Sequence, residues 1–362
     1  MLTEKDQAER DAMLTRLYSA AIGALELLNV YLGERLGLYQ ALASKGALTP
    51  TELASAAGVN ERYALEWLEQ EAVAGILSVE AAHDGEEDRR YSLPAGHAEV
   101  LLDGDSTNFF APMGRALVSI GAVMPNVVEA FRAGGGVPYE AYGQEMRGAI
   151  SALNRPGFLS LLGSEWFPAI PDVDRRLRSQ PPARVADIGC GTGWSSIGMA
   201  RAYPLVTVDG FDLDSASIED ARRNAESSGV NDRVRFEVRN AADPGLAGTY
   251  DLVTAFETIH DMSNPVGALR AMRSLARDGG TILIADGKAA EEFAAPGDEN
   301  ARFMHGVSSL HCLPVGMVDP ESAATGAVMR PDRLRQYARD AGFTDIEILP
   351  VENESWRFYR LV

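Results

Sequence analysis

Glycine residues at a defined spacing are the part of the sequence best suited to holding a small ligand. Gly189, Gly191 and Gly193 form the pattern G-x-G-x-G between the apolar run Arg184–Ile188 and the start of a predicted helix. Glycines let the backbone turn tightly and approach a ligand without a clash from a Cβ atom. A loop between a strand and a helix is also where nucleotide-like ligands bind. A dinucleotide-binding loop has the spacing G-x-G-x-x-G instead, so the pattern favours a different nucleotide-like ligand.

Polar residues around this loop indicate what the ligand carries. Asp187 lies two residues before the first glycine, where an acidic side chain is unsuited to pyrophosphate but suits a cationic amino group and a sulfonium centre. Asp212 ends the second predicted strand, where a carboxylate can accept hydrogen bonds from both ribose hydroxyls. Asn240 follows the third predicted strand and can bind an adenine amino group, while the backbone at Ala241 can meet a ring nitrogen. These positions predict an adenosyl sulfonium as the ligand.

A histidine followed by an acid comes after the fourth predicted strand. His260 and Asp261 follow Tyr250–Phe256, and therefore lie at the same edge of the sheet as the glycine loop. An imidazole, with an ordinary pKa near ~6.5, can accept a proton at neutral pH. Asp261, or Asp286 at the end of the fifth predicted strand, can orient it. The alternatives are a loop or capping role for His260 and a strand-end capping role for Asp286.

Two histidines and a cysteine raise the question of a metal site. His305, His311 and Cys312 provide neither a C-x-x-C pair nor two histidines four residues apart, which are the usual zinc spacings. We therefore predict no metal ion. The insertion 287–329, which contains these residues, is expected to line a pocket or to pack as a loop.

The elements from residue 183 onward bring the candidate residues to one edge of a sheet. Strand-like apolar runs alternate with helical stretches at first, which is typical of a parallel, doubly wound sheet. The last two strands are separated only by Glu352–Glu354, so they are expected to form an antiparallel hairpin. The predicted strands are Arg184–Ile188, Leu205–Phe211, Val234–Val238, Tyr250–Phe256, Thr281–Asp286, Asp345–Val351 and Trp356–Val362.

Residues 36–93 follow the order helix, helix, helix, hairpin, which is the order of a winged helix. Thr49 and Asn60 can cap the second and third helices. The helix over residues 60–72, which would read DNA, carries four glutamates and one arginine, a net charge of −3, whereas binding in the major groove requires positive charge. We therefore expect a dimerisation and substrate-covering role instead. The apolar stripe over residues 12–32 suits burial against a partner subunit or against its own domain.

Composition excludes several classes of protein. The chain has 362 residues, of which 46% are hydrophobic, and a formal net charge of −19, so its surface repels nucleic-acid phosphates and anionic lipid. Two cysteines exclude a disulfide scaffold and fit a reducing cytosol. No run of about 18 apolar residues occurs, and the first residues are charged, so we expect neither a membrane span nor a signal peptide.

Taken in order, these segments resemble the successive motifs of class I S-adenosylmethionine-dependent methyltransferases. The matching segments are Asp-Ile-Gly-Cys-Gly-Thr-Gly from Asp187, the strand end at Asp212, Asn240-Ala241, and Tyr-Asp-Leu-Val from Tyr250. The resemblance covers residues 183–362. It implies an α/β fold with a Rossmann-like seven-stranded methyltransferase sheet, parallel except for an antiparallel C-terminal hairpin.

The N-terminal part resembles the mostly helical winged-helix dimerisation domain of small-molecule O-methyltransferases. The implied domains are a winged-helix-like dimerisation domain over residues 1–105, a helical linker that covers the substrate over residues 106–180, and a catalytic domain over residues 181–362. The resemblance thus implies a cytoplasmic homodimer with a small-molecule substrate, acting on neither nucleic acid nor membrane.

The implied reaction is methyl transfer from S-adenosylmethionine to an oxygen of a small organic molecule such as a secondary metabolite. His260 is the expected base, steered by Asp261 and Asp286. A nitrogen or carbon acceptor, a regulator that senses the cofactor through the winged helix, and a purely electrostatic use of the sulfonium remain alternatives. Expected cofactor contacts are Asp187, Gly189, Gly191, Gly193, Asp212, Asn240, Ala241 and Phe256, and expected substrate contacts are Tyr139, Tyr142, Asn154, Trp166, Met262 and His305.

Overall fold

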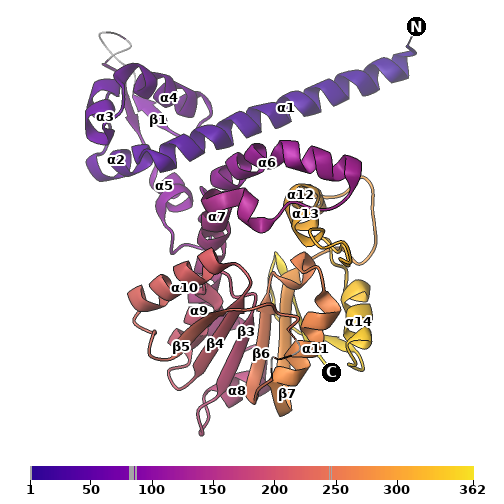
Figure 1. Ribbon diagram of the computed structural model, residues 1–362. Helices are drawn as coiled ribbons and strands as arrows, with labels where there is room; N and C mark the ends of the chain where they lie inside the picture. The colour runs from indigo at the N-terminus through magenta and orange to yellow at the C-terminus, as the bar shows by residue number, and fades with distance from the viewer. Residues whose placement is uncertain (1, 81–84, 86–87, 244, 246) are drawn as a thin grey trace. The chain divides into compact units, whose positions relative to one another are not determined.

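The chain divides into two compact units. The computed structural model describes residues 2–80, 85, 88–243, 245 and 247–362 (Figure 1). The first unit comprises Met1–Val118 and Gly148–Leu153, and the second comprises Ser119–Arg147 and Asn154–Val362. The segment 106–180, which the sequence predicts as a separate linker, therefore contributes to both units.

A seven-stranded sheet forms the centre of the second unit, in the order β5-β4-β3-β6-β7-β9-β8. Strands β3 to β7 run parallel, whereas β9 pairs antiparallel with both β7 and β8. This arrangement confirms the predicted fold class. The strands are β3 (Arg184–Ile188), β4 (Thr207–Asp212), β5 (Val234–Val238), β6 (Tyr250–Phe256), β7 (Ala276–Gly287), β8 (Ile346–Ile348) and β9 (Trp356–Leu361).

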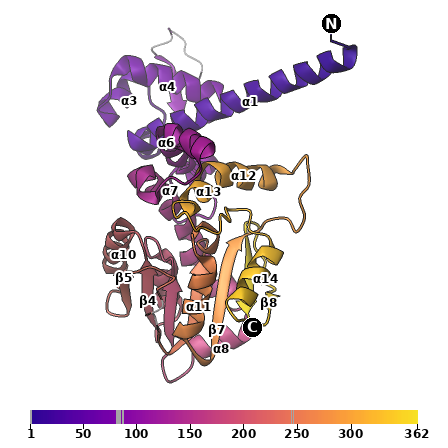
Figure 2. The same cartoon turned by 45° about the vertical axis from the view of Figure 1, so that its right-hand side comes forward.

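Helices cover both faces of the sheet, so its central strands read as continuous apolar runs. One core cluster joins β3 through Val185 to residues of α8, α9 and α10, and the other joins β3 through Ala186 and Ile188 to residues of α11 and α14. Helices α11 and α14 pack against each other (Figure 2). The covering helices are α8 (Pro171–Leu177), α9 (Trp194–Ala202), α10 (Ser215–Ser227), α11 (Pro265–Leu275) and α14 (Pro331–Asp340).

The strand order reverses at β3, because β4 and β5 lie on one side of it and β6 and β7 on the other. Ligands of open α/β sheets bind at the carboxyl ends of the strands beside such a reversal. Short helical segments follow β6 and β7 at this edge, and two more precede β3. These segments are η2 (Tyr139–Tyr142), η3 (Gly157–Trp166), η4 (Ile259–Asp261), α12 (Glu299–Val307), η5 (Ser308–Cys312) and α13 (Leu313–Gly316).

The first unit has the predicted winged-helix order of elements. Thr49 forms a capping box with Glu52, and the side chain of Asn60 accepts hydrogen bonds from the backbone of Arg62 and Tyr63, as expected of helix caps. Two short antiparallel strands follow the helices. The elements are α1 (Glu4–Arg35), α2 (Leu38–Lys45), α3 (Pro50–Ala57), α4 (Glu61–Val73), β1 (Ser78–Glu80), β2 (Arg90–Ser92) and α5 (Ala95–Leu102).

Helices α6 (Met113–Ala133) and α7 (Gly143–Pro156) contribute residues to both units. Among the residues that the structure describes, α6 is the one helix with the length and mean hydropathy (1.3) to cross a membrane. Core helices of soluble proteins meet the same two criteria, so this is weak evidence for a span. The expectation that the chain has no membrane partner stays a prediction.

Candidate active site

The glycine loop after β3 is packed closely against the segment that follows β6. Gly189, Gly191 and Gly193 all have positive φ angles, of 65°, 51° and 85°, which favour glycine. A Cβ on Gly189 would lie 2.2 Å from Oγ1 of Thr258, so the loop is in direct contact with the segment that follows β6. Among the residues that the structure describes, and apart from the chain neighbours of Gly191, no atom lies within 4 Å of the corresponding position on Gly191. The loop is therefore closed at its first glycine and open at its second.

The side chain of Asp187 is buried beside the glycine loop and helps to hold it in shape. Its buried carboxylate accepts hydrogen bonds from the hydroxyls of Ser195 (2.5 Å), Ser196 (2.7 Å) and Thr254 (2.8 Å). Burial raises the pKa of this carboxyl, although the three hydroxyls oppose the shift. The side chain is 1% exposed, so it joins β3, α9 and β6 and is not presented to solvent. This packing differs from the direct ligand contact that we expected.

Asp212 lies at the end of β4, beside the open part of the loop. One carboxylate oxygen accepts the backbone N–H of Gly191 at 2.8 Å, and the other accepts that of Asp214 at 2.9 Å. An ionised carboxylate has about four acceptor positions, so acceptor capacity remains for two ligand hydroxyls. The geometry suits the predicted contact with a ribose.

The three remaining predicted cofactor residues have different surroundings. Asn240 is exposed, and its side-chain oxygen accepts the N–H of Ala242 at 2.9 Å, which leaves its NH₂ group available. Ala241 packs against the core beside β6. Phe256, the last residue of β6, is buried and contacts Phe158 edge to face, with 5.2 Å between ring centroids.

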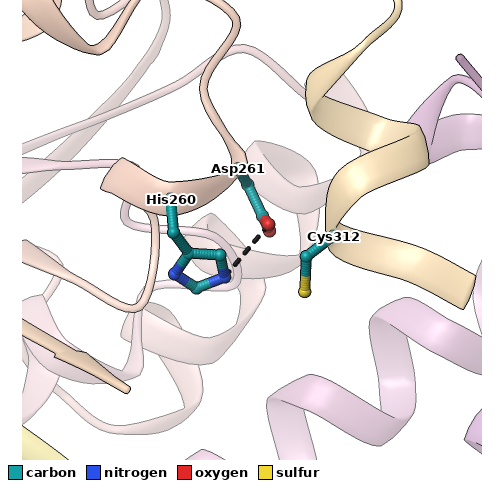
Figure 3. Close-up of side chains that lie close together, drawn as sticks. All are labelled: His260, Asp261 and Cys312. Atoms are coloured by element: carbon teal, nitrogen blue, oxygen red, sulfur yellow. Dashed lines mark ion pairs between the residues drawn. The ribbon is translucent and has the colours of Figure 1, made fainter. Parts of the chain in front are cut away.

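His260 is the centre of a buried cluster of ionisable groups. Its Nδ1 lies 2.5 Å from Oδ1 of Asp286 in a hydrogen bond, and its Nε2 lies 3.0 Å from Oδ1 of Asp261. The sequence-predicted trio is thus brought together from two strand ends. Figure 3 shows His260 and Asp261 with Cys312, which comes from η5. The three ligand-type atoms of these residues lie within 4.8 Å of one another.

The carboxylates determine the charge of the imidazole. Burial alone would lower the pKa of His260, but Asp261 and Asp286 outweigh it and hold the pKa well above its ordinary value. Burial would likewise raise the pKa of Asp261, yet the charge on His260 lowers it overall. The cluster therefore favours an imidazolium between two carboxylates when no ligand is bound.

Glu257 is a member of this cluster that sequence reasoning missed. Its side chain is partly buried, and its Oε1 has no hydrogen-bond partner within the described part of the chain. Its backbone φ of 53° is unusual for a residue other than glycine. Burial first, and then the charge of Asp286, raise the pKa of Glu257 to about 8. A protonated carboxyl can donate a hydrogen bond. Its position directly after a buried strand was the only signal in the sequence.

Aromatic rings line the same region. Tyr142 contacts the ring of His311 edge to face at 4.7 Å between centroids and donates a hydrogen bond to the carbonyl of Leu310 at 2.7 Å. The ring centroid of Tyr139 lies 6.0 Å from that of His311. Burial, then the charges of Asp212 and other acids including Asp261, raise the pKa of Tyr139. Tyr139 therefore lies near both Asp212, the expected ribose contact, and Asp261, which neighbours His260.

Two of the predicted substrate contacts are placed elsewhere. Trp166 is 2% exposed and packs in the apolar core against Trp356 and Phe358, because η3 turns this face of the segment toward the sheet. His305 is exposed on α12 and contacts the ring of Phe293, whereas the neighbouring Met304 points toward Gly287. We therefore remove Trp166 and His305 from the proposed substrate site.

Two further predicted contacts stay predictions. Met262 directly follows η4 and packs against the core. Asn154 is partly buried on α7. Nothing in the contacts of either side chain identifies a ligand.

Comparison with known proteins agrees with this division of the chain. Residues 180–342 match the family model described as a methyltransferase domain, and residues 23–102 match the one described as an Rv2258c-like winged HTH domain. Each match covers less than half of the chain. The winged HTH match lies within the N-terminal helices and β1–β2, and the methyltransferase match covers most of the seven-stranded sheet.

Curated relatives match part of the chain. A malonyl-[acyl-carrier protein] O-methyltransferase of Halalkalibacterium halodurans is 25% identical over 149 residues, which are 41% of this chain and 52% of that protein. A ubiquinone biosynthesis O-methyltransferase of Erwinia tasmaniensis is 37% identical over 102 residues, which are 28% of this chain and 41% of that protein. The chain thus spans about half, or less, of the length of these relatives.

The likeness to a solved structure extends over both units. Human N-acetylserotonin methyltransferase, solved in complex with S-adenosylmethionine, has a TM-score of 0.71 at 16% identity, over 100% of this chain and 99% of that one. At this level of identity the likeness shows a shared fold. That fold includes both the helical N-terminal part and the sheet.

Proposed function

We propose that this chain, in which a methyltransferase domain follows an Rv2258c-like winged HTH domain, transfers a methyl group from S-adenosylmethionine to a small organic acceptor. The observation that carries the proposal is the contact between Gly189 of the glycine loop and Thr258, two residues before His260. Strands β3 and β6 are neighbours in the sheet, so the loop and the histidine share one edge. A cofactor site and a proton acceptor are thus adjacent.

The residues present fit this cofactor. Asp212 would accept the ribose hydroxyls, Asn240 would hold the adenine, and the open position above Gly191 gives room for the ligand against the backbone. Asp187 holds the loop in shape through three hydroxyls. When bound, S-adenosylmethionine supplies an electrophilic methyl group on a sulfonium. The protein's part is to align that group with the acceptor.

His260 is the proposed proton acceptor for an oxygen nucleophile. Nδ1 donates to Asp286, so Nε2 is the nitrogen that can take a proton from a substrate hydroxyl. It can do so only when it is unprotonated, and the two carboxylates oppose that state. The pKa of His260 would fall beside a cationic ligand, because like charges disfavour the charged form. We therefore infer that His260 acts as a base only with the cofactor site filled.

The acceptor that fits best is a small molecule with an acidic hydroxyl, such as a phenol of a secondary metabolite. Tyr139, Tyr142 and His311 offer ring surfaces beside the cluster, and a protonated Glu257 can donate to a substrate oxygen. The relatives named above as O-methyltransferases favour oxygen as the acceptor atom. A nitrogen or carbon acceptor would require less help from His260.

The proposed enzyme acts as a homodimer through α1. This helix has 32 residues, about 48 Å at the usual rise, and its apolar residues remain exposed along most of its length. Leu14, Leu17, Tyr18 and Leu25 are each between 62% and 69% exposed. An exposed apolar stripe of this size is suited to packing against the same helix of a second copy of the chain. The two free, buried cysteines favour the cytoplasm as its location.

Transfer of a labelled methyl group from S-adenosylmethionine tests the function. The purified chain is incubated with panels of phenols, carboxylic acids and amines, and cofactor binding is measured separately by calorimetry. Transfer to a hydroxyl supports the proposal, and transfer to amines alone would replace it with N-methylation. Cofactor binding without any transfer, together with tight DNA binding at low salt, would favour a regulator. The acidic α4, with Glu61, Glu66 and Glu69 on it, argues against that outcome.

A further inference from the structure

We infer that His260, Asp261 and Cys312 form a binding site for a divalent cation of the zinc class. The side chains come from two segments, η4 after β6 and the end of η5, so their spacing in the sequence gives no metal motif. In the fold, Nε2, a carboxylate oxygen and Sγ lie within 4.8 Å of one another (Figure 3). The sequence-based expectation of no metal is thereby revised.

The orientation of His260 is that of a metal ligand. Metal-binding histidines almost always donate their second ring N–H to a carboxylate or carbonyl, which fixes the tautomer and raises the basicity of the ligating nitrogen. Here Nδ1 donates to Asp286 at 2.5 Å, and the backbone N–H of Gly287 donates to the same oxygen at 2.8 Å. This leaves Nε2 facing Asp261 and Cys312.

The space between Nε2 and Asp261 requires a cation. The two atoms lie 3.0 Å apart, yet Oδ1 of Asp261 is buried without an aligned hydrogen bond. An imidazole lone pair and a carboxylate oxygen repel each other, so a proton or a metal ion must lie between them. A proton on Nε2 or a metal ion bound to both atoms satisfies this oxygen, so a metal ion can take the position of that proton.

The position of Cys312 is fixed by packing against the same segment. A Cβ on Gly316, four residues later, would lie 3.2 Å from the carbonyl oxygen of Asp261, and Ser263 donates to the carbonyl of Gly316 at 2.7 Å. Ligand atoms around tetrahedral zinc lie about 3.4–3.6 Å apart, from bond lengths of about 2.0–2.3 Å. A separation at the 4.8 Å limit would therefore need to contract by about 1.2–1.4 Å, and the 3.0 Å between Nε2 and Oδ1 of Asp261 would need to widen by about 0.5 Å.

The donor set selects the class of ion. Imidazole nitrogen, carboxylate oxygen and thiolate sulfur are the ligands of zinc, whereas magnesium and calcium take oxygen ligands. Binding would release one proton from Nε2 and one from Sγ, and the cation carries two positive charges in their place. The net charge of the buried cluster is then unchanged, which removes the main electrostatic objection to a buried ion.

A bound ion would occupy the lone pair of His260 that the proposed reaction needs. On the proposed function, one equivalent of zinc therefore inhibits methyl transfer. Three protein ligands leave a fourth position for water. The inference that the ion binds does not depend on the reaction.

Cobalt(II) titration of the reduced full-length chain tests the site. We expect a single site with a thiolate-to-cobalt charge-transfer band in the near ultraviolet, displaced by Zn²⁺. Cys312→Ser should abolish the band, and Asp286→Asn should weaken cobalt binding by about 10- to 100-fold, as loss of a hydrogen-bonded partner does elsewhere. Cys190→Ser is the matched control, because Cys190 is the only other cysteine of the sequence, and it should retain the band.

The outcomes separate the site from the function. Absence of a thiolate band in the wild-type chain, or a band that persists in Cys312→Ser, would overturn the metal site, and far-ultraviolet circular dichroism shows whether each variant is folded. Asp286→Asn keeps all three ligands, so an unchanged affinity in this variant would also count against it. Cobalt binding in a chain that transfers no methyl group would leave the site standing and remove the proposed function.

Discussion

His260 and Asp286 are joined by a 2.5 Å hydrogen bond from Nδ1 to Oδ1. His260 lies in η4 shortly after β6, and Asp286 lies near the end of β7. Strands β6 and β7 are parallel neighbours, so the sheet itself sets the separation of the two residues. Because one ring nitrogen is held in this way, the other is directed at Asp261. The pair therefore fixes both the orientation of the imidazole and the atom that can exchange a proton with a ligand.

Replacement of Asp286 by asparagine should move the pH dependence of methyl transfer. Asp261 and Asp286 hold the pKa of His260 above its ordinary value, and loss of one negative charge lowers it. The base form then exists at lower pH, so the rising limb of kcat/KM against pH should shift to more acidic values by about 1–3 units. Glu354→Gln, an exposed change elsewhere, serves as the control and should leave the profile in place. A shift toward alkaline pH in Asp286→Asn would contradict this account.

Removal of the imidazole should reduce turnover without loss of cofactor affinity. His260→Ala is expected to lower kcat by roughly 10²–10⁴-fold, the usual contribution of a general base. The dissociation constant for S-adenosylmethionine, measured by calorimetry, should change little, because His260 is not among its proposed contacts. A near-wild-type kcat would mean that alignment of the reactants alone accounts for the reaction.

The first two glycines of the loop, Gly189 and Gly191, should respond differently to a methyl group. At Gly189 a Cβ would lie 2.2 Å from Oγ1 of Thr258, so Gly189→Ala should destabilise the fold and lower the melting temperature. In the described part of the chain, and apart from its chain neighbours, Gly191 has no atom within 4 Å of that position, and its φ of 51° costs an alanine only about 1–2 kcal/mol. Gly191→Ala should therefore fold but bind the cofactor poorly. Full cofactor binding by Gly191→Ala would show that the open side of the loop is not the ligand site.

Asp212→Asn should weaken cofactor binding while the loop keeps its shape. The asparagine retains one oxygen that can accept the N–H of Gly191, but it loses the charge, the acceptor for the N–H of Asp214 and acceptor capacity for the ribose. Hydrogen bonds to charged groups contribute about 1.5–3 kcal/mol, so the dissociation constant should rise by about 10- to 100-fold. The matched variant Asp209→Asn, on the same strand, should bind the cofactor normally.

The sequence was sufficient to place the sheet and most of the loops around the site. Strands β3, β5 and β6 have the predicted bounds, because each is a short, buried apolar run between turn residues. Strand β7 begins at Ala276, earlier than expected, since Tyr250 pairs with Ala276 across an irregular stretch of the ladder. A pairing of that kind depends on the neighbouring strand and leaves no local pattern.

Contacts between distant segments were the part that the sequence could not supply. The pattern of glycines predicted the loop, but the partners of Asp187 are hydroxyls from α9 and β6. Cys312, at the end of the π-helix η5, lies close to His260 and Asp261 of η4, although about 50 residues separate them in the sequence. Trp166 is an aromatic residue of the type that often lines a pocket, but it lies in the core. It is the last residue of η3, which is also a π-helix.

The exposed stripe of α1 should hold two copies of the chain together. Leu17 and Leu25 are each 62% exposed, and burial of a leucine side chain contributes about 1.5–3 kcal/mol. Replacement of both by glutamate should raise the dissociation constant of the dimer by about 100-fold or more, measured as molar mass by light scattering after gel filtration. Val73→Glu is the control, since Val73 is 90% exposed on α4 outside the stripe, and it should leave the mass unchanged. A wild-type chain that is monomeric at every concentration, or a double variant that remains dimeric, would assign the stripe another role.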